Sequence, residues 1–363
     1  MEIFQHSPKD KYSLYRNEGK VIKYLPLNKE EIYNVIHGIK KASRVPVILQ
    51  FWTHSDNFEK QKQQYVLDIM KDYPQDVIII GADIPNVFDG RSDEKEYRWV
   101  NYEQNFDEKL GLDERVAINN WSLLDGIINN FPNANYSKMF SFNPENDGRY
   151  RLLYWWFCLF ERHWQLRGMT NALTDYYEYP NEVHRLYRAI TDFYLRIIER
   201  AKYEVSADGI FTSDDLGTQK SQFFSQEIFD EFFKPYYKEI SDKIHSLNMD
   251  FWLHACGCIE KFLPSFIEIG LDVIHPIQKY TMDEKRIAQL YGDKICIWAG
   301  FDVQRIIPYG TCEDVRNEVR YLFDTYNRKN GRFMFTAGNG INGDCPLDSL
   351  KALYEESFFY KNK

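Results

Sequence analysis

The chain has 363 residues, of which 44% are hydrophobic and 27% charged, as is usual for a globular protein. Its net charge of −9 argues against duplex nucleic acid and anionic membrane surfaces, because both select basic protein faces. No apolar run approaches the roughly 20 residues of a membrane span, and residues 1–13 lack the pattern of a signal peptide. Six irregularly spaced cysteines do not suggest a disulfide framework. We therefore expect a cytoplasmic protein with reduced thiols.

The first half of the chain is predicted to combine a few strands and helices with a long irregular region. The expected elements are a helix at 29–41, a strand at 44–51, a helix at 58–73, a strand at 77–82, a hairpin at 97–106, a strand at about 117–142, and a segment at 149–165 that begins as a strand and turns helical. Residues 84–148 carry loop signals and are interpreted as an insertion.

The second half alternates strand-like and helix-like segments. The expected strands are 209–212, 250–253, 272–275, 295–298 and 332–336, and the expected helices are 182–203, 226–247, 259–269, 284–291, 313–328 and 347–360. This alternation is typical of parallel βα units. With the first half, the count reaches eight or nine strands. The sequence thus predicts an α/β protein, a single (β/α)8 TIM barrel over residues 1–363 with an N-terminal cap at 1–43 and an insertion at 84–148.

Polar and metal-binding side chains follow the expected strands. In a (β/α)8 barrel the active site lies at the C-terminal ends of the strands, so these residues are candidates for function. They include Trp52, His54, Asp83, Asp214, Asp215, Gln219, His254, Cys256, His275, Asp302 and Asn339.

His254 and Cys256 are the candidates for metal binding. Two residues apart on an extended segment, they point to the same face. Both are good zinc ligands, and catalytic zinc commonly takes three protein ligands and keeps one open position. Cys256 and Cys258 also precede the helix expected at 259–269, whose N-terminal dipole would favour a thiolate. The alternative is a histidine that closes a strand end beside a buried, inert cysteine.

Three carboxylates are candidates for acid–base chemistry. Asp83, Asp214 or Asp215 could transfer protons or bind a cationic group. One member of the Asp214–Asp215 pair could instead cap the following helix. Because neighbours on a strand face opposite sides, both cannot point inward, and Asp215 is slightly favoured as the cap or loop anchor.

Aromatic residues make up 17% of the chain. Most are expected in the core, between the barrel and its outer helices. Trp52 and Trp155 are the two expected to reach the site, where they would line a flat apolar pocket.

From about residue 150 to the C-terminus, the chain resembles the uroporphyrinogen decarboxylase superfamily, which also contains zinc-dependent methyltransferases that work on methyl-corrinoid proteins. The segments that carry the resemblance are ADGIFTSDDLGTQ (207–219), FFKPYY (232–237), LHACG (253–257), GLDVIHPIQ (270–278), AGFD (299–302), PYGT (308–311) and 346–354. The resemblance implies a single (β/α)8 barrel, often dimeric.

The departures from true decarboxylases are specific. Asp83 matches their aspartate after the second strand, but residues 51–54 (FWTH) lack their arginine-rich stretch. Asn339, between two glycines, stands where they carry histidine, and Trp164 stands where a tyrosine is expected. Uroporphyrinogen decarboxylation is therefore not expected.

The methyltransferase branch binds zinc through a His-x-Cys pair and a distant cysteine. His254 and Cys256 match the pair, but the distant cysteine would fall near Asn339. Cys345 could replace it if its loop folds back, and Cys258 or a rim carboxylate are further candidates.

The resemblance thus implies a zinc-dependent methyltransferase that acts on a small-molecule substrate, together with either a corrinoid protein or a methylated small molecule. His254, Asp83 and Asp214 would be catalytic. Zinc would bind His254, Cys256 and Cys345, and the expected substrate-binding residues are Trp52, His54, Trp155, Gln219, His275, Asp302 and Asn339. A homodimer would fit the family. One alternative is a metal-free decarboxylase of a tetrapyrrole or another small acid, and another is a non-catalytic barrel that binds a corrinoid or tetrapyrrole.

Overall fold

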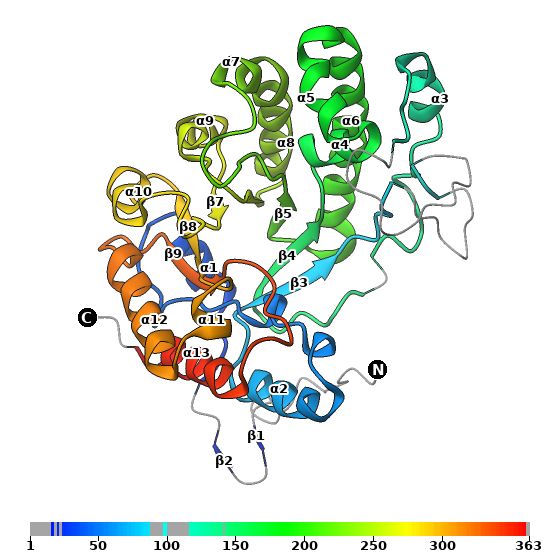
Figure 1. Cartoon of the computed structure of the whole chain (residues 1–363). Helices are drawn as coiled ribbons and strands as arrows, with labels where there is room; N and C mark the ends of the chain where they lie inside the picture. The colour runs from blue at the N-terminus through cyan, green and yellow to red at the C-terminus, as the bar shows by residue number, and fades with distance from the viewer. Residues whose placement is uncertain are drawn as a thin grey trace.

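A curled parallel sheet forms the centre of the protein (Figure 1). The computed structural model describes residues 24–87, 97–99, 116–140 and 142–360, and the backbone of a short antiparallel pair, β1 (Arg16–Asn17) and β2 (Lys20–Val21). The sheet contains seven strands in sequence order, β3 (Val77–Gly81), β4 (Tyr150–Trp155), β5 (Gly209–Ser213), β6 (Asp250–His254), β7 (Val273–His275), β8 (Cys296–Phe301) and β9 (Phe333–Ala337). All neighbouring pairs are parallel, so every C-terminal strand end lies at the same edge.

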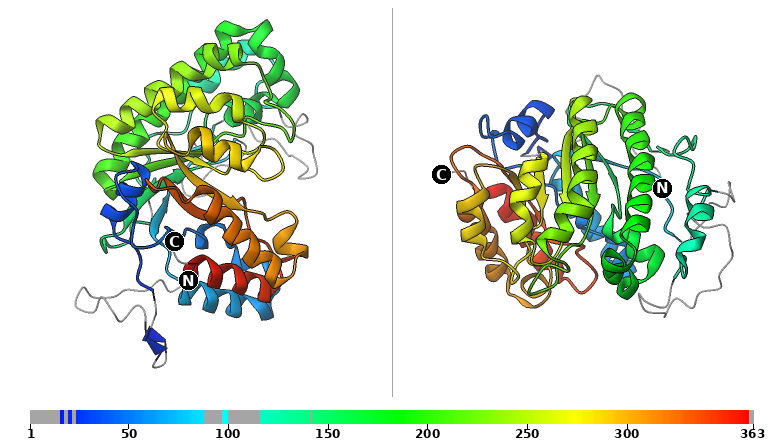
Figure 2. Two further views of the ribbon diagram at one scale, coloured as in Figure 1. Left: turned by 90° about the vertical axis from the view of Figure 1, so that its left-hand side faces the viewer. Right: turned by 90° about the horizontal axis from the view of Figure 1, so that it is seen from above.

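Helices cover the outside of the curled sheet (Figures 1 and 2). They are α1 (Lys29–Ile36), α2 (Lys60–Asp72), α3 (Leu124–Ile128), α4 (Phe160–Arg167), α5 (Met169–Glu178), α6 (Pro180–Val205), α7 (Gln226–Ile228), α8 (Lys234–Ser246), α9 (Leu263–Ile269), α10 (Glu284–Tyr291), α11 (Ile306–Tyr309), α12 (Cys312–Tyr326) and α13 (Leu347–Phe359). A π turn at Phe229–Phe233 joins α7 to α8, which makes one long helix of the segment predicted at 226–247. Within the described ranges, no helix is long and apolar enough to cross a bilayer.

Burial explains why the strands of the second half could be predicted from the sequence. Every residue of β5, β6, β7, β8 and β9 is buried, as expected for a parallel sheet covered on both faces. Such strands appear as short, nearly continuous apolar runs. The predicted α/β class with a parallel sheet is confirmed.

Residues 46–48 lie between the two edge strands, β9 and β3. The Phe335 amide donates to the Pro46 carbonyl at 2.8 Å, and the Ile48 amide donates to the Phe335 carbonyl at 3.0 Å. On the other side the Asp76 amide, just before β3, donates to the Val47 carbonyl at 3.4 Å. Val47 forms only an isolated parallel bridge, and the chain turns into a 3-10 helix at Gln50–Trp52, so the predicted strand at 44–51 is much shorter than expected.

Two further predictions from the first half have different outcomes. A strand at about 117–142 is wrong for the described residues, which instead form a 3-10 turn at Trp121–Leu123 and α3. The expected hairpin at 97–106 lies outside the described residues except for 97–99.

Helix α1 lies across the N-terminal ends of the strands. The Lys29 ammonium pairs with Asp208, just before β5, and His37 at the end of α1 pairs with Asp250, the first residue of β6. The Arg332 amide, just before β9, donates to a carbonyl of α1 at 3.1 Å. These contacts cover one end of the sheet and leave the C-terminal strand ends for a functional site.

Candidate functional site

Three metal-binding side chains converge at the C-terminal ends of β5 and β6. His254 ends β6, Cys256 lies two residues further on, and Asp215 lies two residues after β5. His254 Nε2 is 3.2 Å from Cys256 Sγ and 3.5 Å from Asp215 Oδ1. The three ligand atoms all lie within 4.8 Å of one another. We call His254, Cys256 and Asp215 the ligand group.

Two glycines let the loops after β5 and β6 approach closely enough to form this group. A Cβ atom on Gly257, whose φ is +87°, would lie 2.1 Å from the Gly217 carbonyl oxygen. A Cβ atom on Gly217 would lie 2.6 Å from the Cys258 amide nitrogen. Only glycine fits this backbone contact, and φ near +87° is also costly for other residues. The contact places Asp215 Oδ1 2.7 Å from the Cys256 amide, whose hydrogen bond it accepts.

A chain of hydrogen bonds fixes the tautomer of His254. His275 Nε2 lies 3.0 Å from the Ala337 carbonyl oxygen, which can only accept, so this nitrogen must carry the proton. His275 is buried, and burial lowers its pKa well below the usual range, so it is neutral and its Nδ1 is an acceptor. His254 Nδ1 lies 2.7 Å from that atom and therefore donates to it. The lone pair of His254 Nε2 is left pointing at Cys256 and Asp215, as metal binding requires.

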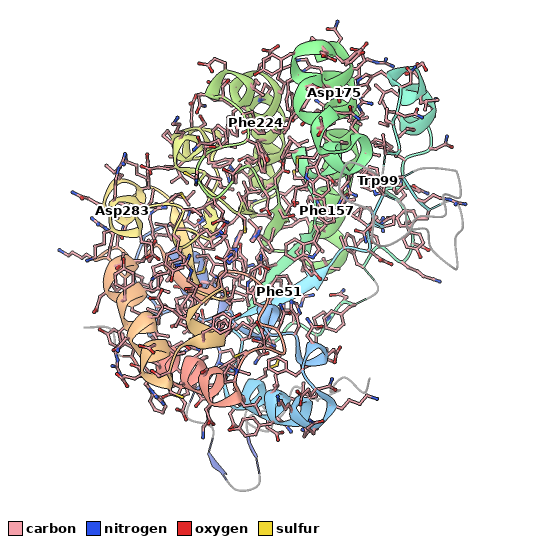
Figure 3. The ribbon with its side chains drawn as sticks, viewed as in Figure 1. Phe51, Trp99, Phe157, Asp175, Phe224 and Asp283 are labelled. Carbon is pink, nitrogen blue, oxygen red and sulfur yellow. The ribbon has the colours of Figure 1, made fainter. Side chains whose placement is uncertain are left out.

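Aromatic rings surround the two histidines. Trp52 stacks on His275 with ring centroids 4.8 Å apart, and Trp298 lies 4.5 Å from His275. Trp156 lies edge-on to His254 at 6.1 Å. Burial lowers the pKa of His254, so this wall keeps both imidazoles neutral near pH 7. Phe51 extends the wall at the middle of the molecule (Figure 3).

The Cys256 thiol differs from the sequence prediction. Burial, Asp215 and Glu161 raise its pKa well above the usual range, and only a hydrogen bond from Asn339 opposes them. The helix expected at 259–269 begins only at Leu263, after a 3-10 turn at Glu260–Phe262, so, contrary to the prediction, its N-terminal dipole does not reach Cys256. A divalent cation would reverse this balance, because metal binding deprotonates a coordinating thiol outright.

Asp214 anchors a helix rather than facing the ligand group. Its carboxylate is fully buried and accepts the amides of Leu159, Phe160 and Glu161 at the start of α4, at 2.8–3.0 Å. It also accepts the Tyr237 hydroxyl at 2.5 Å. Burial raises the Asp214 pKa to about 6. Asp214 thus caps α4, which precedes β5 in the chain, whereas Asp215 accepts the Cys256 amide and is the loop anchor that was slightly favoured, not the cap of the following helix.

Glu161 is a site residue that the sequence reasoning missed. Ser213 Oγ donates to its carboxyl group at 2.5 Å, and the residue is 6% exposed. Burial, followed by Asp215 and Asp214, raises the Glu161 pKa well above the usual range, so this acid holds a proton near the thiol. In the sequence it is one of three charged residues in α4, with Arg162 and Arg167, and nothing there distinguishes it from a surface residue.

A small cavity of about 50 Å³ opens beside Cys256. It is lined by Cys256, Gln278, Lys279, Gly300, Phe301, Asp302, Val303, Gln304, Gly338 and Asn339. Asn339 therefore lies next to the Cys256 thiol. Asp302 lines the cavity too, but its Oδ1 accepts the Gln304 and Arg305 amides and its Oδ2 accepts the Tyr280 hydroxyl, so it shapes the loop.

Three other predicted residues lie away from the ligand group. Trp155 is buried against Tyr194, with ring centroids 5.1 Å apart, and Trp156 takes the place expected for it. Gln219 is exposed in a turn. Cys345 is buried and its thiol donates to the Pro346 carbonyl at 3.4 Å, so it does not join His254 and Cys256.

Two further predicted residues lie at the C-terminal strand ends. His54 is exposed. A Cβ atom on Gly340 would lie 3.0 Å from the His54 ring, so this ring packs against the loop that carries Asn339. Asp83 follows β3, half-buried, and its amide donates to the Met139 carbonyl at 2.8 Å.

Comparison with known proteins gives the family. The uroporphyrinogen decarboxylase (URO-D) family matches residues 164–357, just over half of the chain, and the chain belongs to that family. Among solved structures, the fold is similar to that of a methyltransferase from Methanosarcina mazei, with a TM-score of 0.56 and 12% identity over 91% of this chain and 98% of that one. No curated protein matches the chain by sequence.

Proposed function

We propose that this chain is a zinc-dependent methyltransferase whose metal ligands are His254 Nε2, Cys256 Sγ and Asp215. The observation that carries the proposal is the convergence of these atoms within 4.8 Å beside a small cavity. One nitrogen, one sulfur and one carboxylate oxygen form a donor set that zinc accepts, and three protein ligands leave a position for substrate. Bound zinc would supply the stabilisation of a substrate thiolate as the nucleophile for methyl transfer.

Asp215 takes the third place in this proposal. Asn339 stands at the position expected for a distant cysteine, and its side chain donates to the Cys256 sulfur instead of offering a second thiolate. The carboxylate of Asp215 is already within 3.5 Å of His254 Nε2. Asp215 thus replaces Cys345 in the ligand set predicted from sequence.

The surrounding residues fix the tautomer of His254 in the ligand group and keep water away from its imidazole. His275 holds the His254 tautomer, and the rings of Trp52, Trp156 and Trp298 keep water from the imidazoles. Burial and the neighbouring Asp215 and Asp214 raise the Glu161 pKa, which favours its neutral form near the ligand group.

The cavity size favours a small methylated group. The space beside Cys256 is about 50 Å³, which has room for a methyl group next to the thiol. In this proposal a corrinoid would present its methyl group here, from a partner protein at the C-terminal strand ends. The solved structure of similar fold, a methyltransferase, supports the same reaction class.

The architecture proposed with this function is a closed (β/α)8 barrel, with residues 46–48 as the eighth strand position between β9 and β3. The N-terminal cap at 1–43, the insertion at 84–148, the single domain, the homodimer and the cytoplasmic location stay predictions.

The test is methyl transfer from methylcobalamin to a small thiol by the zinc-loaded protein. Cys256→Ser and Asp215→Asn should each reduce turnover at least tenfold. Cys258→Ser is the matched control and should keep activity, because Cys258 lies two residues on, with its sulfur 4.0 Å from Gln222 and outside the ligand group. Full activity of Cys256→Ser would refute the mechanism. A cobalamin absorption change without turnover would favour a binding protein, and release of CO₂ from a tetrapyrrole acid would favour the decarboxylase.

A further inference from the structure

A second group of metal-binding side chains lies at the opposite end of the sheet. His37 follows α1, Asp250 begins β6 and Asp272 directly precedes β7. Their ligand atoms lie within 4.8 Å of one another. β6 runs from Asp250 to His254, so its length of about 13 Å separates this group from the ligand group. We call His37, Asp250 and Asp272 the basal group.

The two carboxylates of the basal group are held near each other without a lysine or arginine between them. Asp250 pairs with His37 at 2.9 Å, and Asp272 pairs with His245 of α8 at 2.8 Å. Within the described part of the chain, neither carboxylate has an ion pair with a lysine or arginine. The nearby Arg332 guanidinium donates instead to backbone carbonyls of Ile36 and His37, at 3.1 and 2.9 Å.

Other hydrogen bonds orient these carboxylates. Tyr150 donates to Asp250 Oδ2 at 2.7 Å, which leaves Oδ1 for the basal group. Asp272 Oδ2 accepts both the Phe251 amide and His245 Nε2, at 2.8 Å each. Asp272 Oδ1 has no hydrogen-bond partner among the described residues. Support of one carboxylate oxygen by outer hydrogen bonds, with the other left open, is the arrangement found around metal ligands.

Burial makes the convergence costly. The side chains of Asp250 and Asp272 are 7% and 16% exposed, so water screens their repulsion only partly. One divalent cation between the two carboxylates would replace this repulsion with attraction.

We propose that His37, Asp250 and Asp272 form a second divalent-metal site, which fastens α1 to β6 and β7. Ligands about 2.1 Å from one ion lie roughly 3.0–4.2 Å apart, so small side-chain rotations suffice. Imidazole with two carboxylates suits Zn²⁺ and other first-row divalent ions, such as Co²⁺. The basal group contains no sulfur, and this distinguishes it from the ligand group.

The experiment uses the full chain with His254→Ala and Cys256→Ala, which removes the proposed zinc site of the active centre. After chelation, the protein is titrated with Co²⁺ and followed by visible absorption and calorimetry. We expect one equivalent to bind, with d–d bands but no thiolate charge-transfer band. Adding His37→Gln or Asp272→Asn should weaken binding at least tenfold. His184→Gln is the matched control, a half-exposed histidine near Glu231, and it should bind as the double variant does.

The possible outcomes separate this site from the proposed function. If the double variant binds no Co²⁺ up to 1 mM while circular dichroism shows that it is folded, the basal group is only a set of ion pairs and the proposal is wrong. Binding that His37→Gln and Asp272→Asn leave unchanged would also overturn it. Neither outcome depends on whether the Cys256 site binds zinc or transfers methyl groups.

Discussion

Replacement of His275 by phenylalanine should weaken zinc binding without removing a ligand. The phenyl ring can keep the contacts with Trp52 and Trp298, but it removes the acceptor for His254 Nδ1 and the donor to the Ala337 carbonyl. Each of the two buried polar atoms left without a partner costs about 1–3 kcal/mol, so the free energy of unfolding should fall by roughly 2–6 kcal/mol. Loss of such an outer hydrogen bond typically costs 10–100-fold in metal affinity. We expect a zinc Kd raised by that factor in competition with a chromophoric chelator.

A matched control separates the tautomer effect from general loss of packing. His163 of α4 is also fully buried, and it contacts Asp175 of α5 and Tyr187 of α6. His163→Phe should lower the free energy of unfolding by a comparable amount and leave the zinc Kd unchanged. An unchanged zinc Kd in folded His275→Phe would refute the argument that His275 fixes the His254 tautomer.

Three further predictions concern the surroundings of the site. Asp214→Ala removes the acceptor of three α4 amides and of the Tyr237 hydroxyl, so urea denaturation should show a loss of about 2–5 kcal/mol, and a loss below 1 kcal/mol would contradict the anchor role. Gly217→Ala would put a Cβ 2.6 Å from the Cys258 amide and should reduce both stability and zinc affinity, whereas Gly126→Ala, with nothing within 4 Å, should reduce neither. The hydrogen bond with the Asp272 carboxylate raises the His245 pKa. In metal-free protein, the His245–Asp272 pair therefore stabilises the fold most below pH 6.5, where the unfolded-state histidine is also protonated, and less as the pH rises through the folded-state pKa. The stability difference between wild type and His245→Gln should therefore shrink as the pH rises from 6 to 8, and a constant difference would contradict this.

The elements of the second half could be predicted because burial there follows one rule. β5 and β6 are buried throughout and apolar at their centres, and the helix that includes α8 buries a regular stripe, so both patterns appear in the sequence. The predictions for the first half are wrong where long-range contacts determine the secondary structure. The segment at 44–51 is apolar like a strand, yet only residues around Val47 bond to β9, and the chain then turns to bring Trp52 over His275.

Two members of the ligand group, His254 and Cys256, could be predicted from the sequence, whereas Asp215 and the supporting contacts could not. His254 and Cys256 follow from their spacing after an expected strand. Which of Asp214 and Asp215 joins the ligand group depends on which carboxylate accepts the amides of α4. These hydrogen bonds join residues 53–55 positions apart, so a local sequence pattern does not predict them. The role of Glu161 and the contact between Gly217 and Gly257 could not be predicted either. Both depend on segments that are distant in the sequence and meet only in the folded protein.

The central claim is that His254, Cys256 and Asp215 bind one metal ion. The most direct measurement is Co²⁺ substitution of the chelated full-length protein, followed by absorption near the thiolate-to-cobalt charge-transfer band. We predict that wild type shows this band, that Cys256→Ser abolishes it and that Asp215→Asn weakens the Co²⁺ affinity at least tenfold. A wild-type protein that binds Co²⁺ without the band, or a band that survives in Cys256→Ser, would contradict the claim.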